Sequence, residues 1–209
     1  MAEPHLRVIL GSGSPRRKRL LEELGIELTI IAPDIDETPD PDEQAYRYVE
    51  RLAVDKAKEA WRVHATTGGL DAGPAILIAA DTIVAIDGEL LGKPVDDVEA
   101  KAMLGRLAGR THQVHTGVAV RNIEGTKASV TTTDVSFVDI SDADIDWYVA
   151  TGEPRDKAGA YGIHGQAGRF IDRIGGSYQN VVGLPLAALD RLLESTGTSL
   201  TKLSTQTKP

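Results

Sequence analysis

An apolar run with one carboxylate inside it most restricts how this 209-residue chain can fold. The run, Ala75–Ile86, is rich in apolar and β-branched residues, which favour strands. It ends at Asp87-Gly88, a typical hairpin turn, which leads into Glu89–Leu91. We therefore predict that 75–80 and 82–86 form a strand that turns through a hairpin.

Strand-like and helix-like patterns alternate along the rest of the chain, without a visible repeat. Apolar stretches predict further strands at 6–10, 27–32, 112–121 and 128–140. Helical spacing of apolar residues predicts helices at 14–25, 42–65, 96–107, 141–150 and 184–195. The glycine-dense stretch 156–183 predicts tight turns. This alternation indicates a mixed α/β fold.

The length of the chain favours one domain with a full core. We predict this domain over residues 1–197 and a flexible tail over 198–209, because chain ends beyond the last helix are often frayed.

Composition excludes several classes of protein. The formal net charge of −8 argues against a general binder of nucleic acid or of an acidic membrane, since such binders rely on a basic surface. The chain has no cysteine, which excludes a disulfide framework, a thiolate metal site and a cysteine nucleophile. No apolar run approaches the roughly 20 residues that span a bilayer, and the N-terminus lacks a signal-peptide pattern. We therefore expect a cytoplasmic protein.

A basic helix start follows the first predicted strand. Ser14 is suited to cap this helix and Pro15 to its first turn, which then carries Arg16, Arg17 and Lys18. These cations oppose the positive end of the helix dipole. They are either solvated or form a polyphosphate or carboxylate site with free backbone N–H groups. The small residues that precede them, Ser12 among them, favour the site because they let a ligand approach the backbone.

The carboxylate of Asp81 is a second candidate for chemistry, because burying it is costly unless it is paired or binds a metal. It lies in a solvated turn between two strands, or it serves as a general base or a ligand for a divalent cation at a strand end. Lys93, just after the hairpin, is a candidate phosphate partner, although a lone lysine beside a turn is usually only solvated.

The remaining acidic and histidine residues give weaker signals. An acidic cluster at 34–43 reads mostly as a solvated loop, and Glu37 is the member we retain as a metal ligand. His112 and His115 lie three apart in a predicted strand, so they face opposite sides and cannot chelate one ion together. His164 is flanked by glycines and is either a ligand contact or a surface histidine.

Taken together, the motifs of this chain resemble those of the Maf family of nucleoside triphosphate pyrophosphatases. The resemblance covers nearly the whole chain, and its ordered motifs are more specific together than any one alone. The matching segments are Ser12–Arg17, Ala80–Thr82, Gly92–Pro94, Thr111–Gly117, Asp156–Ile163 and Asn180–Pro185.

The resemblance implies an elongated, two-lobed α/β domain with a central mixed sheet, similar to inosine triphosphate pyrophosphatases, and frequent homodimers. It also implies hydrolysis of a nucleoside triphosphate to the monophosphate and pyrophosphate with Mg²⁺ or Mn²⁺. With Ala-Asp-Thr at the second motif, the chain resembles the subgroup of dTTP/UTP pyrophosphatases. Members of this subgroup would also clear modified pyrimidine nucleotides. A nucleotide-sensing regulatory module linked to cell-division arrest is the alternative, but a sensor needs no carboxylate facing its cationic cradle.

The resemblance also implies roles for individual residues, which match the family's motifs position by position. Asp81 matches the proton acceptor, and Glu37 matches an acidic position near the metal; Asp81 is also retained as a metal ligand. The substrate-selecting positions fall on Arg16, Thr82 and His164, and the phosphate-holding lysines on Lys56 and Lys93; Ser12 and Arg17 belong to the same predicted site. His164 departs from the subgroup, which usually has Gln there. An unperturbed histidine facing the base predicts a change in kcat/KM between about pH 6 and 7.5.

Overall fold

The computed structural model of this protein describes residues 6–69 and 73–205. Within these residues, seven strands form one mixed sheet in the order β2-β1-β3-β5-β6-β7, with β4 also paired to β3. The strands are β1 Arg7–Gly11, β2 Leu28–Ile30, β3 Ala75–Ile86, β4 Glu89–Leu91, β5 Thr111–Asn122, β6 Gly125–Phe137 and β7 Ile171–Gly175. β2, β1 and β3 run parallel, and the other pairs are antiparallel. The predicted mixed α/β fold with a central mixed sheet is confirmed.

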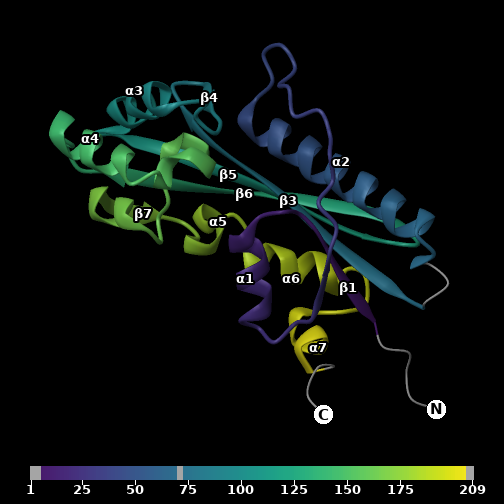
Figure 1. The fold of residues 1–209 in the computed structure, drawn as a ribbon. Helices are drawn as coiled ribbons and strands as arrows, with labels where there is room; N and C mark the ends of the chain where they lie inside the picture. The colour runs from purple at the N-terminus through teal and green to yellow at the C-terminus, as the bar shows by residue number, and fades with distance from the viewer. Residues whose placement is uncertain (1–5, 70–72, 206–209) are drawn as a thin grey trace.

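Helices cover both faces of this sheet (Figure 1). The long helix α2 lies along one face, and α1, α5 and α6 lie on the other (Figure 1). The helices are α1 Pro15–Glu22, α2 Ala45–Thr66, α3 Asp97–Leu107, α4 Asp142–Ala150, α5 Tyr178–Val182, α6 Leu186–Glu194 and α7 Leu200–Thr205. Short 3-10 segments, η2 Glu153–Asp156, η3 Ala158–Ala160 and η4 Gln166–Phe170, follow α4. No helix in these described ranges is both long and apolar enough to cross a bilayer.

Local signals place several helix starts correctly. The Ser14 hydroxyl accepts a hydrogen bond from the backbone N–H of Arg17, and Pro15 is the first residue of α1. Ser141 caps α4 in the same way through the N–H of Asp144. Capping satisfies backbone donors that have no partner inside the helix, so these starts are readable from the sequence alone.

The core forms four clusters along the sheet, and two of them fill its opposite ends. At one end, Leu10 of β1 packs with Leu21, Ile78 and Leu189. At the other end, β4, α3 and α4 enclose a second cluster, whose members include Leu104, Phe137, Tyr148 and Phe170. This arrangement agrees with the two-lobed shape that the sequence predicts.

The structure excludes one alternative and differs from the sequence predictions at two elements. β3 is one continuous strand through Asp81, without a turn there, because β5 pairs with it from Leu77 to Ala85. The glycine-dense stretch contains β7, which pairs with β6 and was not predicted. The predicted tail includes α7, whose Leu203 is buried against the α6 core, so a flexible tail is wrong for 200–205; residues 206–209 lie outside the described residues.

A gap in strand pairing positions the candidate site. β1 pairs with β3 only as far as Gly11 opposite Ala79, and β4 pairs with β3 only from Val84 onward. Between these points no strand of the described residues pairs with this edge of β3. Successive side chains of a strand point to opposite faces, so Asp81 and Thr82 project to the two sides of the sheet beside this gap. Such breaks in a sheet are where α/β proteins commonly bind ligands.

Candidate active site

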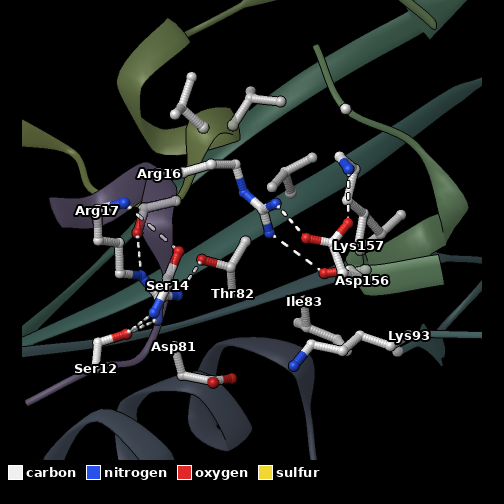
Figure 2. Close-up of a pocket in the computed structure, with 18 of the residues that line it drawn as sticks. Ser12, Ser14, Arg16, Arg17, Asp81, Thr82, Ile83, Lys93, Asp156 and Lys157 are labelled. Atoms are coloured by element: carbon white, nitrogen blue, oxygen red, sulfur yellow. Dashed lines mark hydrogen bonds and ion pairs between the residues drawn. The ribbon is translucent and has the colours of Figure 1, made fainter. Parts of the chain in front are cut away.

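A cavity of about 580 Å³ lies at this gap, between the two ends of the molecule. All of the site residues predicted from the sequence line it, although they come from distant segments of the chain. These residues are Ser12, Arg16, Arg17, Glu37, Lys56, Asp81, Thr82, Lys93 and His164. Figure 2 shows part of this lining, with Lys93 directed towards the cavity from the turn after β4. The cavity is therefore polar and carries cations from both lobes.

Asp81 is buried and paired, which excludes the solvated turn considered from the sequence. Its side chain is 11% exposed, and its Oδ1 accepts a hydrogen bond from Lys56 Nζ at 2.6 Å. Glu37, which is half-exposed, contacts the same Nζ at 2.7 Å. Burial raises the pKa of Asp81 above its ordinary value, while Lys56 and Arg17 oppose this effect. A carboxylate with a raised pKa accepts a proton more readily near neutral pH.

Arg17 is fixed by the fold rather than solvated. Its Nε donates to the carbonyl oxygen of Gly183 at 2.8 Å, and its Nη1 donates to Ser12 Oγ at 3.1 Å. Its Nη2 donates to Thr82 Oγ1 at 3.0 Å (Figure 2). Burial lowers the pKa of Arg17, yet a guanidinium stays charged in proteins. Arg17 therefore fixes Ser12 and Thr82 in place, and a direct contact with a ligand stays a prediction.

Arg16 reaches across the cavity to the segment after α4. Its Nη1 lies 2.9 Å from Oδ2 of Asp156, and its Nη2 donates to the carbonyl oxygen of Asp156 at 3.3 Å (Figure 2). Lys157 contacts the other carboxylate oxygen of Asp156 at 2.6 Å. Asp156 and Lys157 are not among the site residues predicted from the sequence, although both lie in the motif that begins at Asp156. The pairing leaves other N–H donors of Arg16 to bind a ligand.

Hydrogen bonds of the Tyr148 and Glu153 side chains fix the loop that carries His164. Tyr148 Oη donates to Glu153 Oε1 at 2.9 Å and accepts from the N–H of Gly162 at 3.3 Å. Glu153 Oε2 accepts from the N–H of Gln166 at 3.0 Å. His164 lies on this loop and lines the cavity. Its backbone position is therefore set by contacts that a linear motif does not reveal.

The two strand histidines lie apart, as predicted. His112 packs among aromatic rings, and its Nε2 lies 2.8 Å from Tyr161 Oη. His115 contacts Thr132 on the other face of the sheet. Burial lowers the pKa of His112 to about 4, so it is neutral at physiological pH. No group of three or more His, Asp or Glu residues suited to one metal ion occurs among the described residues.

Comparison with known proteins places this geometry in a family. The profile described as "Maf-like protein" matches residues 7–196. The chain belongs to the Maf family. It is 50% identical to a dTTP/UTP pyrophosphatase of Chromobacterium violaceum, covering 96% of this chain and all of the relative. It is 46% identical to a dTTP/UTP pyrophosphatase of Hahella chejuensis, covering 91% and 92% of the two chains.

A solved structure is also similar to this Maf-family chain. It is the Ham1 protein of Staphylococcus aureus, with a TM-score of 0.49 and 17% identity over 91% of this chain and 99% of that one.

The structure moves the pH range in which His164 of this Maf-family protein titrates. Partial burial, and then the charges of Arg16 and Lys157, lower the pKa of His164 below its ordinary value. We therefore expect the change in kcat/KM for UTP to occur at a lower pH than it would for an unperturbed histidine, because protonated imidazole only donates hydrogen bonds. His164→Gln should remove this acid limb in pH profiles of initial rates. Identical profiles and substrate rankings in both proteins would exclude His164 from base contact.

Proposed function

We propose that this protein hydrolyses dTTP and UTP to the monophosphate and pyrophosphate. The observation that carries the proposal is the buried Asp81 carboxylate, held by Lys56 in a cavity whose other charged groups are mainly cations. A site that only bound a triphosphate would gain nothing from a buried carboxylate that repels it. The names of the relatives in Chromobacterium and Hahella support the choice of dTTP and UTP.

In this proposal, some cations of the cavity bind the phosphates and another binds the base. Lys93 and Lys56 both line the cavity, from the segment after β4 and from α2, and are suited to phosphate oxygens. Arg16 already has much of its charge balanced by Asp156, which suits its remaining N–H donors to a neutral base carbonyl. This division places the phosphates near Asp81 and the base near the His164 loop.

Asp81 is proposed to accept the proton of the attacking water. The water oxygen forms a bond to the α-phosphorus, the bond from that phosphorus to the bridging oxygen breaks, and pyrophosphate leaves. Burial raises the pKa of Asp81, which makes it a better base than an exposed aspartate. Lys56 holds the carboxylate in place and balances charge that develops on the phosphates.

A divalent cation, Mg²⁺ or Mn²⁺, fits the donors of this cavity only in part. Glu37 and Asp81 offer two carboxylates, both in contact with Lys56. Mg²⁺ is commonly bound by one or two carboxylates together with substrate phosphates, so these residues suit an ion that arrives with the triphosphate. When bound, such an ion neutralises phosphate charge and acidifies water.

A cytoplasmic location and a homodimer are also part of the proposal.

Product analysis tests this function directly. The purified protein is incubated with dTTP, UTP, CTP, ATP and GTP, with Mg²⁺, Mn²⁺ or EDTA, and the products are separated. We expect pyrophosphate and monophosphate from dTTP and UTP, with loss of activity in EDTA. In ¹⁸O-labelled water the label should enter the monophosphate, because attack is at the α-phosphorus. Nucleotide binding without any product would instead support the sensing module.

Replacing Arg16 with alanine tests its contact with the nucleotide. A charge-assisted hydrogen bond contributes about 1.5–3 kcal/mol, so kcat/KM for UTP should fall by roughly 10- to 150-fold. Arg155→Ala is the matched control, because Arg155 pairs with Asp97 at 3.1 Å and does not line the cavity. Equal kinetics of the Arg16 and Arg155 variants would show that Arg16 is only a surface cation.

A further inference from the structure

A chain of hydroxyl groups leads from the cavity into the core. Thr82 of β3 lies directly opposite Thr116 of β5, and their hydroxyl oxygens are 2.9 Å apart. Thr116 Oγ1 lies 2.9 Å from the carbonyl oxygen of Asn180, at the start of the motif that follows β7. Thr116 and Asn180 are fully buried, whereas Thr82 is partly exposed and lines the cavity.

The chemistry of the two ends fixes the direction of every hydrogen bond in this chain. A carbonyl oxygen only accepts, so the single proton of Thr116 is donated to Asn180. Thr116 therefore has no proton for Thr82, and Thr82 must donate to Thr116. At the other side, the Arg17 guanidinium only donates, so its contact with Thr82 Oγ1 at 3.0 Å uses one lone pair of that oxygen.

These partners leave the Thr82 hydroxyl with one lone pair that can accept a further hydrogen bond. A hydroxyl has one proton and two lone pairs, and here the proton and one lone pair are already used. Anything else that hydrogen-bonds to Thr82 must therefore be a donor. Without these partners a threonine hydroxyl rotates and serves either a donor or an acceptor, so it would discriminate poorly.

We propose that Thr116 is a specificity-determining positioning residue, which orients the Thr82 hydroxyl so that it accepts a hydrogen bond from the N3–H group of uracil or thymine. This inference rests on the proposed function and adds the atom by which the base is selected. Cytosine has an acceptor at N3, which would face the remaining lone pair of Thr82. Two facing acceptors leave both groups unsatisfied, and the mismatch excludes the wrong base.

The hydrogen-bonding character of Arg16 agrees with this assignment. Arg16 only donates, which suits the carbonyl oxygen next to N3 in uracil and thymine. In uracil and thymine, a carbonyl oxygen that accepts lies next to the N3–H group that donates. The donating Arg16 and the accepting Thr82 match these two groups. Because Thr116 does not line the cavity, it acts on the base only through Thr82.

The test compares Thr116→Val with Thr133→Val in the full-length protein. Thr133 is an equally buried threonine, 1% exposed against 0% for Thr116, and it also contacts Asn180, but its hydrogen bonds do not include Thr82. The measurement is kcat/KM for UTP, CTP and N3-methyl-UTP. In Thr116→Val the Thr82 proton is released, so we expect the UTP-to-CTP ratio to fall about tenfold, which corresponds to roughly one hydrogen bond. Thr133→Val should leave the ratio unchanged, and Thr116→Ser should retain the wild-type ratio.

Each outcome bears on the proposal. If Thr116→Val lowers both rates by the same factor, Thr116 is only structural and the inference is overturned. Should that variant not fold, the wild type decides: N3-methyl-UTP turned over as well as UTP overturns the inference, and its selective rejection supports it. If the wild type is active on UTP but the UTP-to-CTP ratio of Thr116→Val is unchanged, this inference is rejected and the proposed function is not. A wild type inactive on every nucleotide rejects the proposed function and this inference with it.

Discussion

Replacing Asp81 with asparagine is expected to lower kcat by about 10²- to 10⁴-fold while nucleotide affinity changes little. Asparagine keeps the shape of the side chain but loses the negative charge that accepts the proton of water. Lys56 retains Glu37 as a partner at 2.7 Å, so the cavity keeps a paired cation and the variant should fold. Steady-state release of pyrophosphate gives kcat, and calorimetry with a non-hydrolysable analogue of dTTP gives the affinity.

A matched control separates catalysis from a general effect of removing a carboxylate. Asp146→Asn removes a charge that pairs with Lys101 at 2.6 Å on the surface and does not line the cavity. We expect this variant to retain wild-type kcat, because exposed ion pairs contribute little. A normal kcat in Asp81→Asn would show that Asp81 is a structural partner of Lys56 and nothing more. Loss of affinity as large as the loss of kcat would instead point to a role in binding the nucleotide with its cation.

The sequence predicts those parts of this fold that depend on local chemistry. Ser14 and Pro15 start α1 because capping and a fixed backbone angle act within one helical turn. Asp87-Gly88 turns β3 into β4 for the same reason, since only a few residues accept the positive φ of such a turn, 54° and 80° here. The predicted site residues meet in one cavity, some from loops and helix starts and others from the middle of β3 and α2.

Other features depend on partners that are distant in the sequence. Asp81 interrupts an apolar run, yet β3 continues through it because β5 pairs along its length and Lys56 balances its charge. β7 forms only because β6 supplies an edge. Thr116 stands in a recognisable motif, but its effect on Thr82 follows from the register between β3 and β5. No periodicity in the sequence specifies that register.

Substituting alanine for Gly117 is expected to destabilise the protein by about 3 kcal/mol or more, at the upper end of the cost of overpacking. Gly117 pairs with Asp81 across β3 and β5 and faces α2. An added Cβ would lie 2.1 Å from the carbonyl oxygen of Val49 and 2.9 Å from the backbone nitrogen of Glu50. Both atoms belong to the backbone of a long helix, so no side-chain rotation relieves the clash, and α2 must move away from the sheet.

The same displacement should reduce activity, because α2 also carries Lys56, about two helical turns further along. Urea unfolding gives the loss of stability, and pyrophosphate release at a temperature where the variant is still folded gives the loss of activity. Gly105→Ala is the control: apart from the backbone of its own helix and its chain neighbours, nothing lies within 4 Å of a Cβ added at this position in α3. Alanine there should leave stability unchanged or raise it by up to about 1 kcal/mol. If Gly117→Ala unfolds at the wild-type urea concentration, the close approach of α2 to β5 is not what holds Lys56 against Asp81.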